Sequence, residues 1–134
     1  MQSVEAFTIH TAQAYLAAAQ TRCWRCRGRM PVVCLYCLSG VVQGEPLEHF
    51  SVQNLQAIDA ALAQQLQRWP HYRFDEAAGC WLNHCPHCQA AQQEHMLHEE
   101  PGQPFFDIDP AAAGLTLTPL VGLLHLSGDT CIDV

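Results

Sequence analysis

Two pairs of cysteines carry the clearest chemistry in this sequence. Cys23 and Cys26 are separated by two residues, and Cys85 and Cys88 repeat the same spacing. This spacing lets two thiolates in one tight turn bind the same ion, and zinc takes four such ligands in a tetrahedron. We therefore predict one structural Zn²⁺ ion held by all four cysteines. Iron is also bound by four-cysteine sites, so the sequence alone does not choose between the two metals.

The two cysteine pairs are far apart in the sequence. Between Cys26 and Cys85 lie 58 residues, whereas a compact zinc ribbon has about 15–20 between its pairs. Loop-closure entropy grows only with the logarithm of loop length, so tripling the loop costs about 1 kcal/mol. A structural zinc ion supplies on the order of 10 kcal/mol of folding free energy. The long gap is therefore compatible with a single shared site.

Four of the six basic residues surround the first cysteine pair: Arg22, Arg25, Arg27 and Arg29. Four thiolates around a zinc ion leave a net negative charge, and nearby guanidinium groups would favour the ionised ligands. The alternative is that the arginines, together with Trp24, contact phosphate or an acidic partner, with the indole stacking on a base.

Several histidines lie close to the second cysteine pair. His84 and His87 flank the ligands, and we expect them to support the ligands or to lie at the surface. His95 and His98 are spaced to share a helix face with Glu94 or Glu99, which raises the alternative of a second, catalytic metal ion. That alternative is the weaker one, because no His-Glu-x-x-His motif is present.

The remaining cysteines are expected to be packing residues. Cys34 and Cys37 have the spacing of a metal pair, but they lie in an apolar run that predicts a strand, where residues three apart face opposite sides. They are therefore best interpreted as small buried hydrophobic side chains. The alternative is a compact metal site shared with the first cysteine pair. Cys80 and Cys131 are interpreted as packing residues as well.

Composition predicts one zinc-stabilised globular domain over residues 1–134. The chain is 49% hydrophobic, has 14% charged residues and a net charge of −7. It has no apolar run long enough for a membrane span, and its first 20 residues lack the basic start of a signal peptide. We expect a cytoplasmic protein with reduced thiols. An acidic chain without lysine is a poor general binder of nucleic acid and suits a basic partner.

The elements that would position the cysteines predict an α+β fold. We call each cysteine pair with its turn a knuckle. We expect a zinc-ribbon-like small antiparallel sheet, with one helix inserted between the two knuckles and further helices flanking the sheet. Expected helices cover residues 12–20, 52–68 and 89–98. Expected strands and hairpins cover residues 4–9, 32–38 with a return at 41–42, 71–74 with 80–83, 115–118, and 120–126 with 130–132.

The helix over 52–68 has the strongest pattern of these elements. Ser51 can cap its N-terminus and Pro70 stops it. Its apolar residues recur at helical spacing: Leu55, Ile58, Leu62 and Leu66.

Three stretches of this sequence resemble a family of uncharacterised bacterial zinc-ribbon proteins. They are Cys-Trp-x-Cys followed by Pro-Val-Val, the run from Asn83 to Cys88, and Leu-His-Glu-Glu-Pro-Gly-Gln-Pro-Phe-Phe over residues 97–106. The resemblance covers about residues 20–133. It implies the four-cysteine zinc site and a bacterial source, and it implies no activity.

The function that we expect is that of an interaction protein without enzymatic activity. Zinc would hold a small scaffold whose acidic surface meets a basic protein partner, as in an immunity protein, an inhibitor or an adaptor. The acidic residues are Glu45, Glu48, Asp75, Glu76, Glu99, Glu100, Asp107 and Asp109.

Two alternatives use the cysteine knuckles differently. A zinc ribbon could bind nucleic acid through the patch at Arg22–Arg29. The Cys85-Pro86-His87-Cys88 motif could instead exchange thiols and disulfides, with Cys85 as a low-pKa thiolate at a helix N-terminus. The second alternative lacks room, because only about 20 residues separate residue 98 from Thr118 and the thioredoxin fold needs a further strand and helix there.

Overall fold

The protein folds mainly as β-structure, with 52% strand and 11% helix. The computed structural model describes residues 6–106, 108–111 and 114–132. In chain order the elements are β1 (Ile9–Arg22), β2 (Arg29–Val42), β3 (Glu45–Ile58), α1 (Ala60–Leu66), β4 (Tyr72–Asp75), β5 (Cys80–Asn83), α2 (Glu94–His98), β6 (Thr116–Pro119) and β7 (Leu124–Ile132). The predicted α+β class with flanking helices is therefore wrong.

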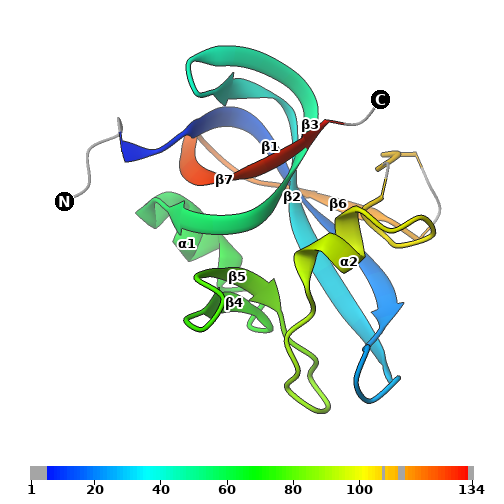
Figure 1. Cartoon of the computed structure of the whole chain (residues 1–134). Helices are drawn as coiled ribbons and strands as arrows, with labels where there is room; N and C mark the ends of the chain where they lie inside the picture. The colour runs from blue at the N-terminus through cyan, green and yellow to red at the C-terminus, as the bar shows by residue number, and fades with distance from the viewer. Residues whose placement is uncertain (1–5, 107, 112–113, 133–134) are drawn as a thin grey trace.

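The long strands form a closed four-stranded barrel with one extra strand (Figure 1). β1, β2 and β3 follow one another as an antiparallel meander. β7 pairs with β3 and also with the start of β1, and this second pairing closes the barrel. β6 adds to the other half of β1. β4 and β5 form a separate two-stranded hairpin, as the sequence predicted.

The barrel is narrow enough that its strands approach one another closely at two glycines. A Cβ atom on Gly40 would lie 2.9 Å from the carbonyl oxygen of His10, and one on Gly128 would lie 2.8 Å from Cγ1 of Val52. Both distances are shorter than ordinary van der Waals contact, so a side chain at either position would force the strands apart.

β2 is buried on both faces, which explains its continuous apolar run. Val33, Leu35 and Cys37 point into the barrel core, together with Leu16, Phe50 and Leu126. The alternate residues Val32, Cys34 and Tyr36 belong to a second core outside the barrel, with Ala17, Leu97 and Phe105. The strand predicted over 32–38 is confirmed, and so are the opposite faces of its two cysteines. The predicted return strand at 41–42 is wrong, because β2 runs on to Val42.

The helix predicted over 12–20 is wrong, because this alanine-rich segment is part of strand β1. Its backbone pairs on both sides: Tyr15, for example, faces Tyr36 of β2 and Pro119 of β6. Long-range pairing of this kind overrides the helix propensity of alanine. Ala17 is fully buried, and its small side chain lets the second core pack closely against β1.

The inserted helix predicted over 52–68 is also wrong in its first half. Residues 45–58 form β3, and only Ala60–Leu66 are helical, after an N-cap at Asp59. Leu62 and Leu66 do pack into the barrel core from the helix, but Leu55 reaches the same core from the strand. The spaced leucines therefore do belong to the core, although they come from a strand and a helix and not from one helix.

The remaining elements differ from the expectations in their bounds. The helix predicted over 89–98 is shortened to α2, and the strand predicted over 115–118 is β6. The hairpin predicted from residue 120 to residue 132 is wrong, because Leu124–Ile132 form the single strand β7. The strand predicted over 4–9 is wrong over residues 6–8, which are not in a strand; residues 4–5 lie outside the described residues, and β1 begins at Ile9. No helix in the described part of the chain is long and apolar enough to cross a membrane.

Candidate metal centre

The first cysteine pair lies in the loop that joins β1 to β2. The last paired residues of this hairpin are Arg22 and Arg29. Two backbone hydrogen bonds shape the loop: the Cys23 N–H donates to Gly28 O at 2.9 Å, and the Arg27 N–H donates to Cys23 O at 3.0 Å. Arg27 has a positive φ of 65°, which turns the chain back toward β2.

The second cysteine pair repeats this loop after β5. An isolated bridge between His84 and Ala91 closes it. The Cys85 N–H donates to Ala90 O at 2.9 Å, and the Gln89 N–H donates to Cys85 O at 2.9 Å. Gln89 has a φ of 67° and so occupies the place of Arg27. The two knuckles therefore share one backbone design, although their sequences differ outside the cysteines.

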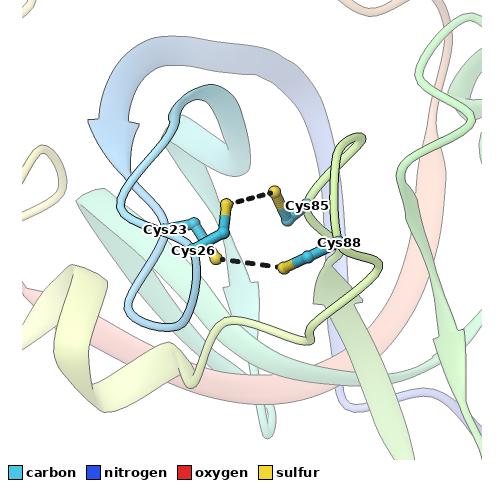
Figure 2. Close-up of side chains that lie close together, drawn as sticks. All are labelled: Cys23, Cys26, Cys85 and Cys88. Carbon is cyan, nitrogen blue, oxygen red and sulfur yellow. Dashed lines mark hydrogen bonds between the residues drawn. The ribbon is translucent and has the colours of Figure 1, made fainter.

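The fold brings the four predicted ligands together (Figure 2). Their sulfur atoms all lie within 4.8 Å of one another. The Sγ atoms of Cys23 and Cys88 are 3.6 Å apart, and those of Cys26 and Cys85 are 3.7 Å apart. A zinc–sulfur bond of about 2.3 Å gives a tetrahedron with edges of about 3.8 Å. The four thiols are not disulfide bonded, so the donor set fits one tetrahedral metal ion.

Hydrogen-bond donors surround the sulfur atoms. The backbone N–H groups of Arg25 and His87 donate to the sulfurs of Cys23 and Cys85 at 3.3 and 3.4 Å. The side-chain amide of Gln92 donates to Cys23 Sγ at 3.4 Å. Donors aimed at sulfur stabilise the ionised thiolate, which is the form that binds metal.

The clustered thiols differ in how readily they ionise. Burial raises the pKa of Cys23, but the backbone N–H groups of Cys26 and Arg25 and the Gln92 amide together lower it to about 6. The Gly28 N–H lowers the pKa of Cys26, yet burial and the three neighbouring sulfurs raise it to about 11. Four close thiols cannot all ionise by themselves, because like charges repel. A bound cation removes this conflict.

Hydrogen bonds that do not involve sulfur also join the two knuckles. The indole Nε1–H of Trp24 donates to Ala91 O at 2.8 Å, and its backbone N–H donates to Gln92 Oε1 at 3.3 Å. His87 Nε2 donates to Arg29 O at 3.2 Å. Trp24 and His87 therefore tie one loop to the other, in addition to any role at the surface.

His84 belongs to a different contact. Its Nε2 atom lies 3.2 Å from Asp75 Oδ2, in the hairpin that precedes the knuckle. The pKa of the Asp75 carboxyl is lowered, chiefly by the hydrogen bond from the Ala78 N–H and also by the contact with His84. Neither His84 nor His87 has a side-chain hydrogen bond to a sulfur atom within the described residues.

Sequence reasoning missed two residues that organise this centre. Gln92 contacts Cys23 and Trp24 while only 3% exposed. Asn83 docks the second knuckle on β2, because its amide accepts from Val33 N–H at 2.8 Å and donates to Val33 O at 3.0 Å. No spacing marks either residue, since amide side chains are equally common in surface turns.

The four arginines stay in solvent. All are exposed, and Arg22 Nη1 donates to the carbonyl oxygen of Arg27 at 3.1 Å. Among the described residues, no arginine forms an ion pair with a carboxylate. None of their guanidinium groups is hydrogen-bonded to a ligand sulfur there, so direct neutralisation of the thiolates receives no support from the structure.

The alternative sites do not assemble in the described part of the chain. Cys34 and Cys37 lie in separate cores, and neither is a member of the four-cysteine cluster. His98 is buried against Phe105 and Glu94 while His95 is exposed, so they share no metal-binding face. Cys85 is followed by a turn, and the next helix begins only at Glu94. The helix N-terminus required for the predicted low-pKa Cys85 thiolate is therefore absent.

Comparison with known proteins adds no assignment. No protein-family model, curated protein or solved structure matched this chain significantly.

Proposed function

We propose that this chain is a zinc-stabilised binding protein whose single Zn²⁺ ion is structural. The proposal rests on the four sulfur atoms, which all lie within 4.8 Å of one another and have two separations of 3.6 and 3.7 Å. Protein sulfur would fill all four coordination positions of the ion. A catalytic zinc site instead keeps one position open for water or substrate, so this site is of the structural type. Membership of the bacterial zinc-ribbon family is part of the same proposal and is supported by the knuckle sequences and the run over residues 97–106.

Elemental analysis of the purified protein tests the metal. We expect one zinc per chain, and a Co²⁺-substituted sample should show the absorption of a tetrahedral thiolate site. Cys85→Ser should lower metal content and stability, whereas Cys37→Ser, a cysteine outside the cluster, should retain the zinc. One iron per chain would identify the bound metal as iron and not zinc. A folded protein without metal would overturn the proposal.

We further propose that the acidic surface binds a basic protein, in the manner of an immunity protein, an inhibitor or an adaptor. The net charge of −7 supports it. Six of the acidic residues are exposed: Glu45, Glu48, Glu76, Glu99, Glu100 and Asp109. Asp75 is partly buried beside His84, and Asp107 lies outside the described residues. A cytoplasmic location in a bacterium belongs to this proposal.

Affinity purification from the native host tests the partner. We expect a basic protein whose binding weakens as salt is raised, because complementary surface charges are screened. Glu45→Gln with Glu48→Gln, and Glu99→Gln with Glu100→Gln, would show which acidic cluster contacts it. Recovery of nucleic acid alone, or of no protein, would count against this partner.

A further inference from the structure

A cleft of about 870 Å³ lies beside the candidate metal centre. One wall is formed by the end of β1 and the first knuckle, and the other by α2 and the chain that follows it to residue 115. Its volume is within the range of ligand pockets, about 300–1,000 Å³. The proposed function leaves this cleft without a role.

The cleft gathers positive charge on an otherwise acidic protein. The side chains of Arg22, Arg27 and Arg29 line it, and only Glu100 and Asp109 oppose them among its described lining residues. The three guanidinium groups form no ion pair with a carboxylate in the described part of the chain. A phosphate group could therefore bind them without displacing an existing salt bridge.

Two exposed aromatic side chains border the same cleft. Trp24 is 46% exposed and Phe106 is 44% exposed. The hydrogen bond from the Trp24 indole to Ala91 O holds its ring in one orientation, so little conformational entropy is lost when a ligand stacks on it. Stacking of a base on an aromatic side chain contributes about 1–3 kcal/mol.

We propose that this cleft binds a nucleotide unit, with its base stacked on Trp24 or Phe106 and its phosphate held by the arginines. The unit is supplied either by single-stranded nucleic acid or by a free nucleotide. The inference rests on the proposed metal centre, because Trp24 and Arg27 lie within the first knuckle. Zinc content is therefore measured in every sample, so that loss of the metal and failure of the cleft can be distinguished.

Binding of a labelled single-stranded oligonucleotide to the zinc-loaded protein, followed by fluorescence anisotropy, tests the proposal. Contact with the single phosphate of the bound unit predicts that log K falls with log salt with a slope of about −0.7, whereas contacts of the three arginines with neighbouring phosphates of a strand predict a slope of about −2. Competition by mononucleotides separates the two sources: effective competition identifies a free nucleotide, and its absence identifies a single strand. Failure of both probes to bind the zinc-loaded protein would overturn the proposal.

Variants of opposite charge sharpen the test. Arg27→Gln should keep the fold of the first knuckle, because glutamine already occupies the equivalent position of the second knuckle: Gln89 has a φ of 67° and Arg27 a φ of 65°. We expect it to weaken binding about tenfold, as loss of a charged hydrogen bond would, and Phe106→Ala to weaken it about tenfold through lost stacking. Glu100→Gln should strengthen binding.

The matched controls are Arg73→Gln and Glu76→Gln, which change exposed charges outside the cleft. They should leave affinity unchanged, and all variants should keep one zinc per chain. Equal weakening by Arg73→Gln and Arg27→Gln, or an equal gain from Glu76→Gln and Glu100→Gln, would mean that binding is a general charge effect and would overturn the assignment of the cleft.

Discussion

Among single residues, Gln92 makes the most varied contacts at the metal centre. Its amide nitrogen donates to Cys23 Sγ and to Ala90 O, while its amide oxygen accepts from the Trp24 N–H. One side chain therefore orients a ligand in the first knuckle from the chain that leaves the second. Mutation of a hydrogen-bond partner of this kind typically lowers metal affinity about 10–100-fold.

Replacing Gln92 by leucine should lower zinc affinity about 10–100-fold while leaving the four sulfurs in place. The change removes a donor to Cys23 Sγ and leaves the Trp24 N–H without its acceptor. Competition with a chromophoric chelator measures the effect. Gln93→Leu, at the exposed neighbouring position, is the control; identical affinities for the two variants would contradict this role.

The buried thiol of Cys37 is expected to make the free energy of unfolding decrease at alkaline pH. Burial raises the pKa of its thiol from 9.0 to about 12, although Thr11 partly opposes the shift. Above pH 9 the unfolded chain loses this proton while the folded chain keeps it. The contribution is therefore complete below pH 9 and declines toward pH 12, by about 1.4 kcal/mol per pH unit.

The variant Cys37→Ala should show a shallower decline of the free energy of unfolding with pH over this range. Urea denaturation at a series of alkaline pH values measures the slope. The variant is less stable overall because it leaves a small cavity, so the test compares slopes and not absolute stabilities. Parallel curves for the two proteins would show that the thiol is not buried in the barrel.

At the scale of elements, Asp59 joins the short helix α1 to the barrel. Its Oδ1 atom accepts from the Leu62 N–H at 2.9 Å, which caps the helix. Its Oδ2 atom accepts from the His125 N–H at 3.1 Å, and its own N–H donates to His125 O at 2.9 Å. A helix of seven residues is too short to be stable alone, so these contacts to β7 matter.

Asp59→Ala should destabilise the protein by about 2 kcal/mol, because it removes the cap and leaves the His125 N–H without its acceptor. Asp59→Asn keeps an oxygen for the Leu62 N–H and should fall between wild type and alanine. Chemical denaturation measures both variants. A loss of equal size in the two would show that the cap contributes little and that the contact to His125 dominates.

The whole molecule has two cores, and they differ in their relation to the metal. The barrel core contains none of the four clustered cysteines, whereas the second core includes Cys23 and Cys85. Leu97, Phe105 and Ile108 complete the second core from the chain that follows the second knuckle. The four-cysteine cluster therefore lies where the β1–β2 hairpin meets this later chain (Figure 1).

Removal of the metal with a chelator should loosen the second core before the barrel. We expect amide hydrogen exchange to rise first in residues 23–28 and 84–106, while the amides of β1–β3 that pair within the barrel keep their protection. Mass spectrometry of peptides after exchange measures the order. Simultaneous loss of protection in both regions would show that the metal centre and the barrel unfold as one unit.

The sequence by itself predicted which four cysteines cluster and which strand is the most apolar. Paired cysteines at a two-residue spacing act locally, so their chemistry and their turns are readable from neighbouring residues. The run over 32–38 is apolar at every position, and only a strand buried on both faces needs that pattern.

Tertiary structure alone decided the barrel and the surroundings of the metal. Alanine-rich β1 and leucine-spaced β3 carry helical patterns, yet both are strands because partners distant in sequence satisfy their backbone groups. β7, which closes the barrel against β1, begins more than a hundred residues after that strand does. Helix and strand propensities depend on neighbouring residues in the sequence, so they do not reflect pairing with distant strands. The contacts of Gln92 and Asn83, and the arginine-lined cleft, likewise join segments that are distant in the sequence, and no spacing in the sequence marks them.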